Sequence, residues 1–224
     1  MKKCIYLFLS LVILNHFLFS ANESIDYIID NYIKKGDWQN AKIELSNYVI
    51  INQKDPDGFS FLSVVCNELR QYDEAIINCR KAIINEASME KKGELYFNLG
   101  SYYYNRGTKN VALTMFQKSI ELNNLIANPY YMIGLIYYED NDLDNCIIYW
   151  QKYVDISVES DKREQVALVI EQWKKTKEES IKELGSDTNA DITNEKYDNS
   201  KEEDNNSQKS IQDSIENEIK NSKE

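Results

Sequence analysis

The fold is decided by the stretch Tyr96-Phe97-Asn98-Leu99-Gly100-Ser101-Tyr102-Tyr103. Leu99 and Tyr103 are four residues apart, a spacing that places both side chains on one face of a helix. Gly100 lies beside them and has no Cβ, so it allows a second helix to come close. Ala112 and Phe116 follow at a spacing that predicts this second helix. The stretch therefore predicts two helices packed against each other.

The helix pair recurs at a nearly fixed period. The small residue near the start of each second helix stands at Ala41, Ala75, Ala112 and Cys146, in steps of 34, 37 and 34 residues. The residue that opens each first helix follows the same steps, at Ile25, Phe59, Tyr96 and Tyr130. The periodicity predicts first helices near 24–35, 57–69, 93–105 and 127–139. We expect the three extra residues of the middle step in the connection at 86–92, because loops tolerate insertions.

This pattern resembles the tetratricopeptide repeat, whose first helix opens with W-x₂-L-G-x₂-Y and whose period is about 34 residues. The resemblance extends over about residues 22–183. It implies an all-α fold: a right-handed α-solenoid of helix-turn-helix repeats with a C-terminal capping helix and a disordered tail. Ile29 and Ser63 stand where the family has Gly, so the first two repeats depart from the pattern.

Four segments follow from the resemblance and the composition. We predict a signal peptide at 1–21, four repeats at 22–159 (about 22–55, 56–92, 93–126 and 127–159), a capping helix at 160–184 and a disordered acidic tail at 185–224. The first segment is basic, then apolar, then small, which is typical of a cleaved secretory signal. An exported bacterial protein, periplasmic or in the cell envelope, is therefore expected. The alternative is a membrane anchor that stays uncleaved.

The two C-terminal segments differ in character. The predicted capping helix carries an apolar stripe, whereas its other faces are filled with Lys and Glu, as the end of a repeat stack requires. The tail has too few apolar residues to form a core. Ile211, Ile215 and Ile219 recur there every four residues and could form a short helix on a partner, although a solvated tail is the other interpretation.

Several classes of chemistry are excluded by the residues. The one histidine is His16, inside the predicted signal, so His-activated nucleophiles are absent from the mature chain. Cys66, Cys79 and Cys146 are odd in number and do not form a disulfide framework. The acids at 139–144 lack the Gly and distal Glu of a calcium loop. The net charge of −11 disfavours nucleic acid. We therefore expect no enzyme, no cofactor and no metal.

The resemblance also implies a site. The family binds extended peptides or partner helices in a concave groove lined by its first helices. The matching positions in this chain are Asp26, Asp30, Asn67, Phe97, Ser101, Tyr104, Tyr131, Leu135 and Tyr138. Asp26, Asp30 and Glu94 stand where some members have the basic clamp for a C-terminal carboxylate, so that mode of binding is not expected.

The groove would have an aromatic floor and an acidic rim. The floor is Phe97, Tyr104, Tyr131 and Tyr138, and the rim acids include Asp26, Asp30, Asp57, Glu68 and Glu139. Such a groove suits a protein or peptide with apolar anchors and basic flanks. The other interpretation is that these aromatic side chains pack against each other.

Two functions stay open from the sequence. The first is a protein-interaction scaffold of the cell envelope that binds its partner in the groove. The second is a structural subunit of an envelope assembly, joined through its convex face or its tail. The sequence leaves the oligomeric state open, and we expect no membrane insertion of the mature chain.

Overall fold

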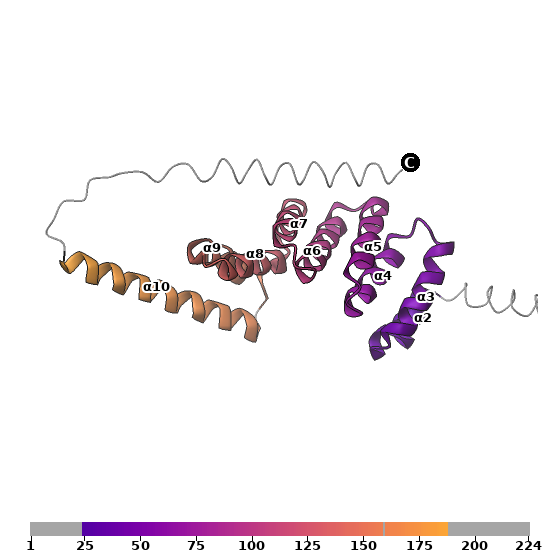
Figure 1. Ribbon diagram of the computed structural model, residues 1–224, viewed down its shortest axis with the longest axis horizontal. Helices are drawn as coiled ribbons and strands as arrows, with labels where there is room; N and C mark the ends of the chain where they lie inside the picture. The colour runs from indigo at the N-terminus through magenta and orange to yellow at the C-terminus, as the bar shows by residue number, and fades with distance from the viewer. Residues whose placement is uncertain (1–23, 159, 188–224) are drawn as a thin grey trace, which may run out of the picture. The chain divides into compact units, whose positions relative to one another are not determined.

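The computed structural model describes residues 24–158 and 160–187, and every regular element in them is a helix (Figure 1). The predicted signal peptide and the tail with its three isoleucines lie outside the described residues. In chain order the elements are α2 (Ile25–Asn31), the 3-10 helix η1 (Ile33–Lys35), α3 (Trp38–Ile51), α4 (Pro56–Glu68), α5 (Tyr72–Asn85), α6 (Met89–Asn105), α7 (Lys109–Leu122), α8 (Ala127–Glu139), α9 (Leu143–Ile156) and α10 (Asp161–Asp187).

The chain divides into two compact units. Unit 1 is Met1–Thr108 and unit 2 is Lys109–Glu224. The division falls between α6 and α7, the helices expected to pair in the third repeat. Each unit is described by itself below.

The repeat is visible in the backbone of its turns. Four residues have a positive φ: Gly36 at 71°, Arg70 at 57°, Gly107 at 92° and Asn141 at 60°. They follow one another in the same steps of 34, 37 and 34 residues as the sequence pattern. A left-handed residue just past the end of a helix turns the chain and satisfies its last carbonyl groups. The predicted period is therefore confirmed by the turn that ends each first helix.

Two first helices differ in length from the expectation. The first does not run continuously through 24–35, because α2 ends at Asn31 and η1 follows. The third begins at Met89 rather than at 93, so α6 has 17 residues, whereas α4 and α8 have 13 each. The three extra residues form an additional turn of helix instead of a longer loop.

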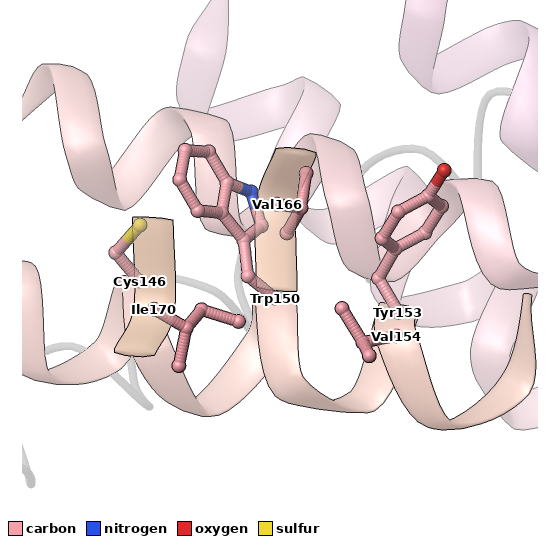
Figure 2. Packing of buried hydrophobic residues seen from close by; sticks show 6 residues of the cluster. All are labelled: Cys146, Trp150, Tyr153, Val154, Val166 and Ile170. Atoms are coloured by element: carbon pink, nitrogen blue, oxygen red, sulfur yellow. The ribbon is translucent and has the colours of Figure 1, made fainter. Parts of the chain in front are cut away.

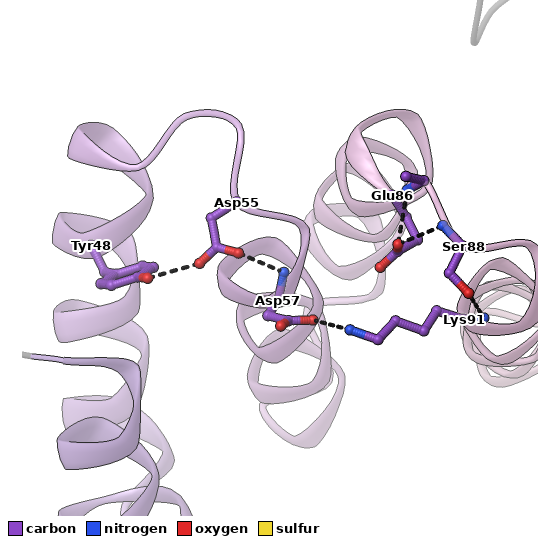
Figure 3. Close-up of polar contacts among 7 residues, drawn as sticks. Tyr48, Asp55, Asp57, Glu86, Ser88 and Lys91 are labelled. Carbon is purple, nitrogen blue, oxygen red and sulfur yellow. Dashed lines mark hydrogen bonds and ion pairs between the residues drawn. The ribbon is translucent and has the colours of Figure 1, made fainter.

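Carboxylates and hydroxyls fix the helix starts in unit 1. The Asp55 carboxylate accepts the Asp57 N–H at 3.1 Å and the Tyr48 hydroxyl at 2.7 Å (Figure 3). Glu86 accepts the backbone N–H groups of Ala87 and Ser88, both at 2.8 Å. These side chains satisfy donors that have no partner within the helix.

The core of unit 1 lies between α3, α4, α5 and α6. Its fully buried side chains include Leu45, Val65, Cys66, Cys79 and Leu99. Cys79 Sγ donates to the carbonyl oxygen of Leu95 at 3.3 Å. Both thiols are free. Burial raises the pKa of Cys66 to about 11 and that of Cys79 to about 12, so both stay protonated at neutral pH.

The core of unit 2 is built by α8, α9 and α10. Figure 2 shows its buried cluster of Cys146, Trp150, Tyr153, Val154, Val166 and Ile170. Gly134 of α8 faces the Trp150 ring, because a Cβ added there would lie 2.2 Å from Trp150 Cδ1. The expectation that Gly134 allows the paired helix to approach is confirmed.

Candidate functional site

The nine predicted groove residues share one property, which is access to solvent. Asp26, Asp30 and Tyr138 are exposed, whereas Asn67, Phe97, Ser101, Tyr104, Tyr131 and Leu135 are half-buried. The helix positions between them behave differently. Leu99 and Tyr103 of α6 are buried, as are Ile133 and Ile136 of α8. Each first helix therefore separates a core face from a face that a partner can reach.

In unit 1 a hydrogen bond joins the predicted face of α4 to α6. Asn105 Nδ2 donates to Asn67 Oδ1 at 2.9 Å across 38 positions of sequence. Ser101 Oγ donates to the Phe97 carbonyl oxygen at 3.0 Å, within the same helix. Lys91 of α6 lies 3.7 Å from the Asp57 carboxylate of α4 (Figure 3). The two first helices thus present Asn67, Phe97, Ser101 and Tyr104 from elements that are linked at both ends.

Lysines pair with three of the five predicted rim acids. Lys34 Nζ lies 2.6 Å from Asp30, and this hydrogen bond raises the pKa of Lys34. Lys109 Nζ lies 2.7 Å from Glu139 in unit 2. Asp57 has the contact with Lys91. These pairs are solvent-exposed, so each contributes little stability and can be exchanged for a partner's basic group.

In unit 2 the groove aromatics of α8 stack on other aromatic rings. Tyr131 stacks on Trp150 with 5.9 Å between ring centroids and 9° between planes. It also meets Tyr153 at 5.3 Å. Tyr138 stacks on Trp150 at 6.0 Å and on Trp173 of α10 at 5.7 Å. Both interpretations of these aromatics therefore hold in part, because they pack against each other and yet keep an open edge.

A cation from α10 completes this aromatic surface. Lys162 Nζ lies 3.4 Å from the centroid of the Tyr131 ring and 5.9 Å from that of Tyr153. Burial lowers the pKa of Lys162 and raises that of Tyr131. A cation over an aromatic face is stabilised by the ring quadrupole.

Sequence reasoning missed Lys162 and Trp150 as neighbours of the groove residues. It placed Trp173 only in the apolar stripe of the capping helix. One signal could have found them: Lys162, Val166, Ile170 and Trp173 are spaced at i, i+4, i+8 and i+11, so they form a single helical stripe.

A shallow cleft of about 490 Å³ lies beside Trp173. Its walls are the start of α9 and the middle of α10, with Leu143, Ile147 and Trp173 as apolar lining and Asp142, Asp144 and Lys177 as polar lining. Among the described residues, no group of His, Cys, Asp or Glu side chains is arranged to hold a metal ion. No helix in the described part of the chain has the length and apolar character needed to span a bilayer.

Comparison with known proteins identifies the repeat. The sequence model of the tetratricopeptide repeat matches residues 93–124 and 127–157, the predicted third and fourth repeats. No curated protein sequence matches the chain at a significant level.

Solved structures share the fold at low sequence identity. A crystal structure of MamA has a TM-score of 0.57 and 21% identity, and the match covers 71% of this chain and 90% of that one. MamA residues 41-end from Desulfovibrio magneticus RS-1 gives 0.54 and 21%, covering 70% and 91%. YrrB, described as a TPR protein with an unusual peptide-binding site, gives 0.52 and 22%, covering 63% and 69%. With two matched repeats, periodic turns and this fold, the chain is a tetratricopeptide repeat protein.

Proposed function

We propose that this chain is a non-enzymatic interaction scaffold of the cell envelope that holds an extended peptide or a partner helix against its first helices. The observation that carries the proposal is the solvent access of all nine predicted groove residues. Aromatic side chains that are held in place and partly exposed give a partner large contact area at low entropy cost. The fold likeness to YrrB, a protein with a peptide-binding site, is in keeping with this proposal.

The partner's chemistry follows from the residues at these positions. Phe97 and Tyr104 on α6 offer apolar contact, and Asn67 on α4 offers an amide. Asp26 and Asp30 add negative charge, and the Lys34 pair with Asp30 is exposed enough for a basic residue to replace it. A segment with apolar anchors and basic flanks fits this set.

The envelope part of the proposal rests on residues 1–21. Their basic, apolar and small order supports export with cleavage at the end of this segment. N-terminal sequencing of the protein from its native cells tests this part, with Ala21 or Asn22 expected as the first residue. An intact Met1 in the membrane fraction would instead support the anchor.

The alternative function, assembly through the convex face, is favoured by a separate observation. Ile43 of α3, Ile77 of α5 and Ile148 of α9 occupy the same slot of their repeats and are 56%, 52% and 56% exposed. Exposed isoleucine at one repeated slot is unusual for a surface that only meets water. Ile50 lies two helical turns after Ile43 and is also exposed.

One experiment separates the two functions. The tagged full-length chain is cross-linked in its native compartment and its partners are quantified by mass spectrometry. We compare Phe97→Ala with Tyr104→Ala, which alters the groove, against Ile43→Ser with Ile77→Ser, which alters the second helices. Loss of the partner by roughly tenfold or more in the groove variant alone supports the groove. Loss only in the isoleucine variant supports assembly through the convex face.

A further inference from the structure

Helix α10 contacts unit 2 along one narrow stripe. Val166 and Ile170 are buried in the cluster of Figure 2, at 7% and 3% exposure. Trp173 stacks on Trp150 of α9 and on Tyr138 of α8, both with 5.7 Å between ring centroids. After Trp173, residues 174–179 are all exposed. The apolar attachment of α10 is thus limited to about three turns of a much longer helix.

Basic side chains flank this stripe at both ends. At the start of α10, Lys162 covers the Tyr131 ring and Arg163 Nε donates to the Val154 carbonyl oxygen at 2.9 Å. Beyond Trp173, Lys174 donates to Gln151 at 3.1 Å and Lys177 pairs with Asp144. Apolar anchors between basic flanks are the chemistry that the groove residues predict for a partner. The chain therefore supplies this chemistry itself, on the surface formed by α8 and α9.

The position of α10 is that of a further first helix that lacks its second helix. It begins at Asp161, which follows the first residue of α8, Ala127, by 34 residues. Leu168 holds the slot that Gly134 holds in α8, and it is 65% exposed. The helix does not turn there but continues to Asp187. The surface of α8 and α9 therefore accepts a single helix, and the outer side of that helix stays open.

From these contacts we infer that α10 is a tethered occupant of a helix-binding surface, and that the partner carries a helix of the same chemistry that takes its place. That helix has Lys or Arg, two aliphatic residues and Trp at i, i+4, i+8 and i+11, with further basic residues beyond the Trp. The inference rests on the proposed function for the existence of a partner. It adds the partner's pattern and a competition that limits access to Tyr131 and Tyr138.

The probe for this inference is a fluorescein-labelled peptide with the sequence of residues 160–179 of this chain. Binding is measured by fluorescence anisotropy to the full-length chain and to its Lys162→Gln with Lys177→Gln variant. These substitutions loosen α10 without altering α8 or α9. A tethered helix competes at an effective concentration in the millimolar range, so the unaltered chain should bind the peptide weakly. We expect the variant to bind it at least about fivefold more tightly, given the usual strength of an exposed cation–π contact and an ion pair.

Substitutions in the peptide test the stripe. Trp173→Ala in the peptide should weaken binding to the variant chain by roughly tenfold or more, as for a buried aromatic anchor. Leu168→Ala is the matched control, because Leu168 faces away from the surface, and it should leave binding unchanged. Equal binding by the two chains, or equal loss with Leu168→Ala and Trp173→Ala, would overturn the inference.

The outcome is separable from that of the proposed function. The Phe97→Ala with Tyr104→Ala chain alters unit 1 only, so peptide exchange on unit 2 should be the same in it. Failure of peptide exchange leaves the groove of unit 1 as the proposed partner site. Failure of the groove variant to affect the partner leaves the α10 result intact.

Discussion

The Trp150 indole fills the space in which a side chain at Gly134 would lie. A Cβ at Gly134 would be 2.2 Å from Trp150 Cδ1 and 2.6 Å from Nε1. Trp150 Nε1 donates to the Tyr131 carbonyl oxygen at 3.1 Å, and its ring is stacked on Tyr131, Tyr138 and Trp173. Because the indole is held on several sides, it cannot move aside cheaply.

Gly134→Ala should therefore destabilise unit 2 even though alanine favours helices. We expect a loss of about 1–3 kcal/mol, the usual cost of overpacking, measured as the free energy of unfolding in urea. Asn128→Ala, at an exposed position of the same helix, is the control and should change stability little. Equal stability of the two variants would show that Trp150 repacks.

Arg70 offers a stabilising substitution. It is exposed and has a φ of 57°, in a slot where two other repeats have Gly. A left-handed conformation costs an L-residue about 1–2 kcal/mol, partly offset by the chain entropy of Gly. We expect Arg70→Gly to raise the free energy of unfolding by roughly 0.5–1 kcal/mol. Arg70→Ala removes the charge but keeps the Cβ, so a similar gain there would contradict the explanation.

Leu99 is fully buried in unit 1. Leu99→Ala should reduce the free energy of unfolding by about 2–5 kcal/mol, because it leaves a cavity. Deletion of residues 188–224 should change stability little, since the composition of this segment offers few core residues. A deletion as damaging as Leu99→Ala would mean that the tail docks on the folded part.

Alkaline pH should weaken the fold. Burial raises the pKa of Cys79 from 9.0 to about 12, and burial with the hydrogen bond to Asp55 raises that of Tyr48 from 10.0 to about 12. The unfolded chain loses these protons first as pH rises. Stability is thus fully present below pH 9 and declines from there toward pH 12. Urea unfolding between pH 7 and 11 measures the decline, which should be shallower in Cys79→Ala.

The thiols should be unreactive until the protein unfolds. Cys66, Cys79 and Cys146 are buried, and burial raises the pKa of each. An Ellman titration of the native protein should therefore detect almost no fast reaction. In urea the protein from its native cells should titrate three thiols, because Cys4 leaves with the signal peptide. A fourth thiol would show that residues 1–21 are retained.

Much of the fold follows from the sequence because each repeat uses the same local physics. Ala75 and Ala112 mark second helices since only a small side chain lets two helices touch, and both are fully buried. The turn at Asn141 was equally regular. The extra turn of α6 was not predicted, because the sequence of Met89, Glu90, Lys91 and Lys92 is compatible with either an exposed loop or an exposed helix.

The site was predictable only position by position. Repeat register assigned Tyr131 and Tyr138 to a solvent-accessible face, and both keep solvent access. The register says nothing of what other elements bring to that face. The contact of Lys162 with Tyr131 joins residues of different helices, and it depends on where α10 begins and how its stripe is oriented. A long polar helix with plentiful Lys and Glu has many such orientations before it is packed.

The connection between α5 and α6 has a mechanical consequence. Only residues 86–88 separate the two helices, and Glu86 is bonded to the backbone of the other two. Such a connection has no slack, so tension on the chain passes directly from one helix to the next. Under load, α4, α5 and α6 should therefore yield together in a single step rather than peel off one by one.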